Sequence, residues 1–134
     1  MALLFDASVL IEHERGRLDL EHRLGRRGEE ECFLSVITAS ELLHGVHRAR
    51  GAGIGSRRAA WVEAMIERFP LVPVDLAIAR AHARLWSNLA AEGSLIGPHD
   101  LWLAATGLSR GLALVTANRR EFDRVPGLVV EEWS

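Results

Sequence analysis

Three of the eighteen acidic residues stand in apolar surroundings, where an ionised carboxylate costs free energy unless something compensates its charge. Asp6 follows a short apolar run, Glu41 lies inside an apolar stretch that begins at Val36, and Asp100 opens a very apolar helix. Carboxylates that converge repel one another, so one must stay protonated unless a cation neutralises the group. Mg²⁺ and Mn²⁺ prefer such oxygen ligands. Carboxylate-bound metal can activate water and stabilise a phosphoryl transition state, so the three acids indicate that chemistry.

Each of these acids also has a purely structural interpretation. Asp6 suits a turn or cap between a strand and a helix. Glu41 and Asp100 suit the first turn of a helix, where the helix dipole favours a negative charge. The residue types alone leave both interpretations open.

Short apolar runs typical of strands alternate along the chain with longer segments of helical periodicity. This alternation predicts the strands and helices that position the acids. Strands are predicted over residues 3–5, 32–36, 71–74, 113–116 and 128–130. Helices are predicted over residues 7–13, 57–69, 76–91 and 100–109. A further helix is predicted within residues 15–31, with its end at Gly25 or Gly28, and another from Thr38 or Ser40 to about residue 50. Strands that alternate with helices predict an α/β protein with a parallel sheet, whose carboxyl edge is where ligands bind. Pro73 predicts an edge position for the third strand.

Length and composition limit the protein class. We expect residues 1–134 to form a single domain. The one cysteine excludes an internal disulfide and fits a reducing compartment. The N-terminal segment has no basic region, and acids interrupt its apolar runs, so we expect neither a signal peptide nor a membrane span, and a cytoplasmic location. The net charge of -2 excludes a generally basic nucleic-acid binder, and all sixteen cationic residues are arginine, which excludes mechanisms that require lysine.

Three other patterns indicate sites that their context does not support. The glycines of residues 51–56 suggest a phosphate loop, but they follow a predicted helix instead of a strand. His44 and His47 have a metal-binding spacing, yet no cysteine or third ligand is placed to complete a zinc site. A haloacid-dehalogenase-type phosphatase or a phospho-receiver also has an acid after its first strand. Both normally need a lysine, and the phosphatase needs a second aspartate where Ser8 stands.

Four segments, in the same order along nearly the whole chain, resemble the motifs of PIN-domain ribonucleases. They are Leu3 to Leu10 with Asp6 and Ser8, Thr38-Ala39-Ser40-Glu41-Leu42, Ile96-Gly97-Pro98-His99-Asp100-Leu101 with the residues to Ala105, and Val115-Thr116-Ala117-Asn118-Arg119-Arg120-Glu121-Phe122. The resemblance is closest to the VapC toxins of bacterial toxin–antitoxin pairs. It implies a three-layer PIN-like α/β fold, with a central parallel sheet of about five strands flanked by helices. The implied activity is Mg²⁺- or Mn²⁺-dependent endonucleolytic cleavage of transfer or ribosomal RNA, which would inhibit translation and growth.

The resemblance also implies roles for particular residues. Asp6, Glu41 and Asp100 take the catalytic and metal-ligand roles. Asn118 stands where many relatives carry aspartate; it keeps an acceptor oxygen but loses the charge, so a second metal site would be weak unless Asp123 supplies charge. Two hydroxyls could position a metal-bound water or phosphate, or serve as a helix cap and a strand-end hydroxyl: Ser8 and Thr116. The arginines expected at an RNA-contacting rim are Arg57, Arg58, Arg119 and Arg120.

Partners follow from the same resemblance. A small VapB-like antitoxin would block the acidic site with an inserted arginine, and toxin and antitoxin would form a hetero-oligomer. DNA would be contacted only through the antitoxin, and no membrane is expected. A two-fold homodimer is implied too, and an apolar surplus that includes Trp86 and Leu89 supports it. Asn118 leaves one alternative open: a catalytically weak PIN-fold protein that acts mainly as the antitoxin's partner in operon autoregulation.

Overall fold

A single parallel sheet of five strands forms the centre of the computed structural model, which describes residues 1–51 and 53–134. The strands are β1 (Leu3–Phe5), β2 (Cys32–Ser35), β3 (Leu71–Val72), β4 (Ala113–Thr116) and β5 (Val130–Glu132). They lie in the order β3-β2-β1-β4-β5, and every neighbouring pair is parallel. The α/β class and the five-stranded sheet are thereby confirmed, and β3 does lie at an edge.

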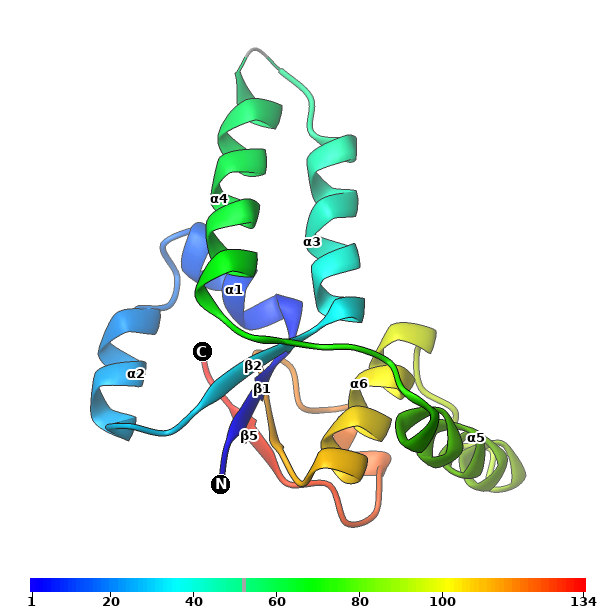
Figure 1. Cartoon of the computed structure of the whole chain (residues 1–134). Coiled ribbons are helices and arrows are strands. Elements are labelled where there is room, and N and C mark those ends of the chain that lie inside the picture. The colour runs from blue at the N-terminus through cyan, green and yellow to red at the C-terminus, as the bar shows by residue number, and fades with distance from the viewer. Residues whose placement is uncertain (52) are drawn as a thin grey trace.

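Helices cover both faces of this sheet (Figure 1). They are α1 (Ala7–Glu14), α2 (Leu20–Arg27), α3 (Val36–Arg48), α4 (Ile54–Arg68), α5 (Leu76–Ala91), α6 (Pro98–Arg110) and a short 3₁₀ turn at Phe122–Arg124. Figure 1 shows α3 and α4 projecting side by side away from the sheet, while α5 and α6 pack together at its other side. The three-layer arrangement expected from the resemblance is therefore confirmed.

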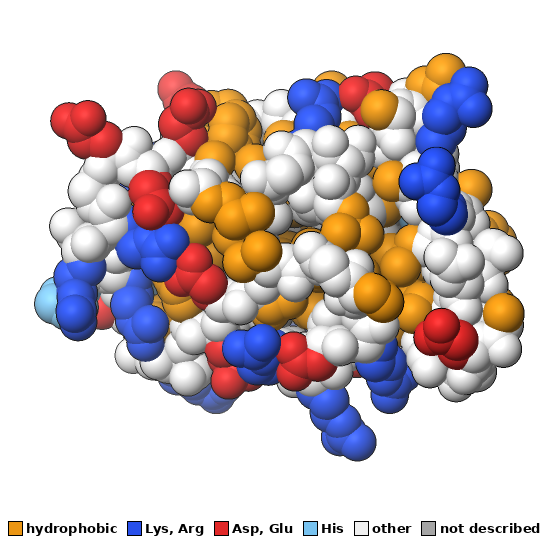
Figure 2. Space-filling model, turned by 90° about the horizontal axis from the view of Figure 1, so that it is seen from below, with side chains coloured by type: hydrophobic (Ala, Val, Ile, Leu, Met, Phe, Trp, Pro, Cys, Tyr) orange, Lys and Arg blue, Asp and Glu red, His pale blue; other side chains and the backbone are white. Residues whose placement is uncertain are grey.

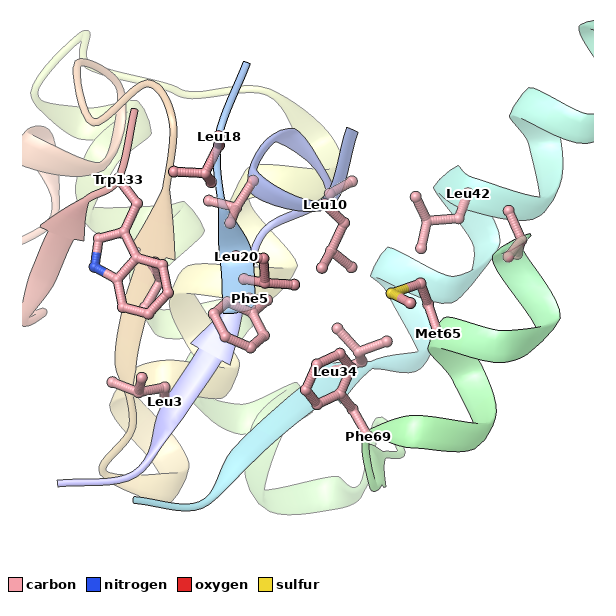
Figure 3. Close-up of a cluster of buried hydrophobic side chains, with 14 of the residues drawn as sticks. Leu3, Phe5, Leu10, Leu18, Leu20, Leu34, Leu42, Met65, Phe69 and Trp133 are labelled. Carbon is pink, nitrogen blue, oxygen red and sulfur yellow. The ribbon is translucent and has the colours of Figure 1, made fainter. Parts of the chain in front are cut away.

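Alternation along the central strand β1 divides the core in two. Leu3 and Phe5 point toward a cluster with side chains of α1, α2 and α4, whereas Leu4 joins a cluster formed mainly by α5 and α6. The Phe5 ring packs edge-on against Phe69, with ring centroids 5.4 Å apart, and against Trp133 at 5.6 Å (Figure 3). Because β1 is buried on both faces, its three residues are all apolar, as is typical of a central parallel strand.

Several predicted boundaries were wrong, and local capping explains one of them directly. α3 begins at Val36, before Thr38 or Ser40, because the Ser35 hydroxyl at the end of β2 accepts a hydrogen bond from the amide of Ile37 at 3.0 Å. The helices predicted to begin at residues 57 and 100 begin at Ile54 and Pro98. The third strand is shorter than predicted, and the last lies at Val130–Glu132 instead of 128–130. Of the glycine-containing segment 51–56, Ala52 lies outside the described residues.

Some large hydrophobic side chains remain at the surface. Figure 2 shows hydrophobic side chains spread across the middle of one face, with arginines and acids mainly around its edge. Trp86 is 54% exposed, but Leu89 is only 1% exposed because it packs into the core beside α6. The sequence analysis had included Leu89 in a surface for self-association, and its burial shows that this prediction was wrong. Trp86 remains available for such a contact. Among the described residues, no helix is both long and apolar enough to cross a membrane.

The close packing of α6 on the loop before β5 gives a stability prediction. A Cβ atom at the buried Gly107 would lie 2.8 Å from Leu128 Cδ1 and 3.3 Å from the backbone oxygen of Leu112. Gly107→Ala should therefore destabilise the protein by about 1–3 kcal/mol through overpacking, although alanine is the better helix former. Gly25→Ala in α2 is the matched control, because nothing lies within 4 Å of its added Cβ. That variant should gain about 0.5–1 kcal/mol. Urea unfolding that ranks the two variants equally would contradict this packing.

Candidate active site

The three acids singled out in the sequence lie together at the carboxyl edge of the sheet. Asp6 directly follows β1, Glu41 lies in the second turn of α3, which follows β2, and Asp100 lies in the first turn of α6. The charge of Asp6 acts on both other carboxyls, and the charge of Glu41 acts on Asp100. Because β1 and β2 are neighbours in the sheet, the segments that follow them emerge side by side.

Two hydroxyls hold the Asp6 carboxylate. Its Oδ2 accepts hydrogen bonds from Ser8 Oγ and Thr116 Oγ1, both at 2.8 Å. Each hydroxyl in turn accepts a backbone amide hydrogen, Ser8 from Ala117 at 2.9 Å and Thr116 from Asn118 at 3.1 Å. Each hydroxyl can thus donate its hydrogen to Asp6 and accept a backbone amide hydrogen at the same time. The network fixes the orientation of the Asp6 side chain, and Asp6 is only 8% exposed.

Ser8 therefore does not cap α1, and that alternative for it was wrong. Asp6 occupies the cap position itself, but its side chain accepts no capping hydrogen bond from the helix. Its oxygens are instead directed across the sheet toward the end of β4. The structural interpretation of Asp6 as an ordinary cap thus has no support from its hydrogen bonds.

Glu41 carries a buried oxygen that lacks a partner. Among the described residues, its Oε1 is the one buried side-chain oxygen or nitrogen without a hydrogen bond. His99 Nδ1 lies 3.4 Å away, within ion-pair distance but outside hydrogen-bond geometry. Burial raises the pKa of the Glu41 carboxyl, the charge of Asp6 raises it further, and His99 opposes the rise. An unpartnered buried oxygen is costly, so this atom is suited to a ligand that the protein itself does not supply.

Asp100 shares a proton with a fourth acid, Glu121. Burial, hydrogen bonding to Glu121 and the charge of Asp6 together raise the pKa of Asp100 to about 7. The same hydrogen bond from Asp100, together with one from the backbone amide of Gly97 at 3.2 Å, lowers the pKa of Glu121. The proton therefore resides on Asp100 and the negative charge on Glu121. The sequence analysis did not select Glu121; the signal that could have found it is its place in the fourth motif, directly before the buried Phe122.

The other fourth-motif residues lie differently. Asn118 is exposed, and its Oδ1 accepts the amide hydrogen of Arg120 at 3.4 Å. Asp123 is also exposed and binds the guanidinium of Arg119 at 3.0 Å. The charge that this motif brings into contact with Asp100 is thus that of Glu121, and Asp123 is engaged with an arginine on its own turn.

The four arginines expected at a rim fall into two groups. Arg58 forms an ion pair with Glu14 at 3.2 Å, and Arg119 pairs with Asp123. Arg57 and Arg120 are exposed. Arg58 also lines a small pocket of about 60 Å³ between α1, α3 and α4, to which Glu41 contributes. The acidic edge thus opens next to a groove with both apolar and charged walls.

The donor set fits a divalent cation. Four carboxyl groups meet at one edge, one of their oxygens is buried without a partner, and one carboxyl retains a proton to about neutral pH. A cation would compensate both features, because hard divalent ions take carboxylate oxygens as ligands. The described residues nevertheless contain no three acidic, histidine or cysteine side chains already arranged to enclose an ion.

The raised pKa of Asp100 gives a signed stability prediction for the cation-free protein. In chelator, the folded wild type keeps the Asp100 proton to a higher pH than the unfolded chain does, so its stability should fall between about pH 4 and pH 7. Asp100→Asn removes this loss and should melt at or above the wild type at pH 8. After allowance for solvent screening of a half-buried group, the difference is on the order of 1–2 kcal/mol.

The control for this experiment is Asp123→Asn, which removes an exposed carboxylate that already has a cationic partner. It should cost about 0.3–0.5 kcal/mol at pH 8, because it removes one exposed ion pair. If Asp100→Asn melted far below the wild type at pH 8, Asp100 would be a structural residue of the α6 first turn.

Comparison with known proteins shows the family to which the chain belongs. The PIN domain model matches residues 3–128. The chain is 34% identical to the tRNA(fMet)-specific endonuclease VapC of Salmonella typhimurium, over 91% of this chain and 85% of the relative. It is 31% identical to the ribonuclease VapC1 of Rickettsia felis, over 97% and 95% of the two chains.

A solved structure has the same fold. The crystal structure of DNA-bound VapBC from Salmonella typhimurium superposes with a TM-score of 0.90 at 29% identity, over 100% of this chain and 99% of that chain. The sequence and structure matches both extend over nearly the whole length of the chain. The protein therefore belongs to the PIN-domain family and, within it, to the VapC ribonucleases.

Proposed function

We propose that this protein is an endoribonuclease toxin that cleaves RNA and is neutralised by a small VapB-like antitoxin. The observation that carries the proposal is the meeting of Asp6, Glu41, Asp100 and Glu121 at one sheet edge, with an unpartnered Glu41 oxygen and a retained proton on Asp100. The names of its relatives, a tRNA(fMet)-specific endonuclease and a ribonuclease, support RNA as the substrate. Transfer RNA is thereby the favoured RNA class. The single cysteine is compatible with action in the cytoplasm.

The proposed cofactor is Mg²⁺ or Mn²⁺, held by Asp6, Glu41 and Asp100. Bound there, a divalent ion would lower the pKa of a water molecule and stabilise negative charge on phosphoryl oxygens. The protein's own groups prepare this edge. Ser8 and Thr116 orient the Asp6 carboxylate, while Glu121 accepts the hydrogen bond from the protonated Asp100.

The exposed arginines are proposed to set RNA affinity. Arg57 and Arg120 are exposed, so their charges are available to phosphates. Arg58 and Arg119 already have acidic partners, so binding RNA would require these guanidinium groups to be shared or released. We therefore expect the first pair to contribute more to RNA affinity than the second.

The proposed antitoxin contact is the groove between α1, α3 and α4. Ile11, Leu42 and Trp61 give it apolar walls, and Glu41 places a carboxylate in it. An inserted arginine would find a charged partner there, which is the geometry that charge-assisted hydrogen bonds favour. The solved VapBC complexes of similar fold support an antitoxin partner, and one bound to DNA supports contact with DNA through the complex. A homodimer remains part of the proposal, with the exposed Trp86 as a candidate contact.

Cleavage of RNA by the purified protein tests this function. The wild type should cleave transfer RNA in Mg²⁺ and lose that activity in excess chelator. Asp6→Asn should lower the rate at least 100-fold, because it removes the charge that two hydroxyls hold in place. Glu92→Gln, an exposed acid at the end of α5, is the matched control and should cleave at the wild-type rate.

A different pattern would favour the weaker alternative. If the wild type bound its antitoxin but showed no metal-stimulated cleavage beyond that of Asp6→Asn, the protein would act mainly as a partner in operon autoregulation. The presence of Glu121 at the position where the fourth motif meets Asp100 speaks against that outcome.

A further inference from the structure

A second charged pocket lies beside β5, the strand at one edge of the sheet. It has a volume of about 670 Å³ and opens between α2 and β5. Its lining residues are His22, Arg23, Arg26, Arg27, Glu131 and Trp133. Figure 1 shows α2 and the C-terminal end of the chain on the same side of the molecule, far from α5. Nothing in the proposed cleavage chemistry uses this pocket.

The three arginines of the pocket differ in how far their charge is already matched. Arg27 donates to both oxygens of Glu131, at 2.6 and 2.8 Å, and also to Glu30 at 2.9 Å. Arg23 contacts the main-chain oxygen of Ser134, at 3.0 Å, and its guanidinium lies 5.8 Å from the Trp133 ring centroid. Arg26 is exposed and forms no ion pair within residues 1–51 and 53–134. Among the described residues, no acidic side chain pairs with Arg23 or Arg26, so these two guanidinium groups, one helical turn apart, can each contact an external anion.

Hydrogen bonds connect this pocket to the acidic edge. Trp133 donates its backbone amide to the carbonyl of Thr116 at 2.9 Å, and the Thr116 hydroxyl binds Asp6. β5 lies two strands from β1, which is about 10 Å at the usual spacing of strands. Because β5 is parallel to β4 and β1, its end, where Arg23 contacts Ser134, lies at the same edge of the sheet as the acids. One extended nucleic-acid strand can therefore touch both places.

We propose that this pocket binds backbone phosphates of the RNA strand whose cleaved bond lies at the acids, an inference that rests on the proposed function. The acidic edge itself repels RNA, so affinity must come from cationic surface nearby. Guanidinium groups match phosphate geometry and carry a charge at any relevant pH. The Trp133 ring is buried in the core and its indole nitrogen donates to Glu131, so no base can stack on it. The pocket is therefore expected to bind the RNA backbone without specificity for the base sequence.

The test compares charge removal in the pocket with the same charge removal elsewhere. The double variant Arg23→Gln/Arg26→Gln is measured against Arg80→Gln/Arg84→Gln, two exposed arginines on α5. Affinity for a fluorescein-labelled single-stranded RNA is followed by anisotropy in EDTA over a series of salt concentrations. The pocket variant should flatten the slope of log K against log salt by about 1.4, for two lost phosphate contacts. The α5 variant should keep the wild-type slope.

A third variant tests the sign of the effect. Glu131→Gln keeps an oxygen for the Trp133 indole but removes the charge that neutralises Arg27. It should bind the same RNA severalfold more tightly than the wild type at low salt. Thermal melting of all variants checks that each is folded at the assay temperature. Weaker binding by folded Glu131→Gln, or an unchanged salt slope in the Arg23→Gln/Arg26→Gln variant, would overturn the proposal.

Cleavage assays separate this proposal from the proposed function. With Mg²⁺, the pocket variant should raise KM for a long RNA and leave kcat unchanged, while a short RNA that covers only the acidic edge should be cleaved as by the wild type. Equal KM values for the long RNA would refute the pocket and leave the ribonuclease function standing. No cleavage by the wild type would refute the ribonuclease function, yet a flattened salt slope would still support the pocket. If the Arg23→Gln/Arg26→Gln variant lost antitoxin binding but kept the wild-type salt slope for RNA, the pocket would be a contact for the antitoxin. That result would overturn the proposal.

Discussion

Mutual repulsion among four carboxyl groups is the constraint on which this structure depends. At an effective dielectric constant near 20, two unit charges about 4 Å apart oppose each other by about 4 kcal/mol, a large fraction of the stability of a small domain. The metal-free protein limits this cost by keeping a proton on Asp100 and by giving Asp6 two hydroxyl donors. Glu41 has less relief, since one of its oxygens is buried without a hydrogen-bond partner and only the nearby His99 offsets the repulsion. A divalent cation bound among these carboxyl groups would therefore reduce their repulsion.

The rest of the fold supplies the rigidity that keeps these groups together. β1 lies between β2 and β4, so the segments that follow β1 and β4 meet at one edge, where Asp6 binds Thr116. Phe5 is anchored between Phe69 and Trp133, which fixes the residue immediately before Asp6. A hydrogen bond from the amide of Gly97 to Glu121 ties the first turn of α6 to the loop after β4. The acids can therefore move apart only if the closely packed core around them is disturbed.

How much the sequence could predict depended on the surroundings of each residue. Asp6 and Asp100 could be selected because a charge among apolar residues has few structural explanations, and the alternation of apolar segments predicted the sheet that joins them. Glu121 could not be selected in this way, since it stands in a run of charged residues that resembles an ordinary surface turn. Only the folded chain shows that its carboxyl meets Asp100. The same holds for the α2–β5 pocket, where Arg27 and Glu131 meet from positions 104 residues apart.

A divalent cation that binds at the acidic edge should replace the proton on Asp100. Calorimetric titration with Mg²⁺ near pH 7, repeated in buffers with different ionisation enthalpies, measures the protons released on binding. Since the pKa of Asp100 is about 7, the wild type should release roughly half a proton per ion at that pH and almost none at pH 9. Asp100→Asn should release none at either pH. Mg²⁺ binding by the wild type with the same heat in every buffer at pH 7 would contradict the account.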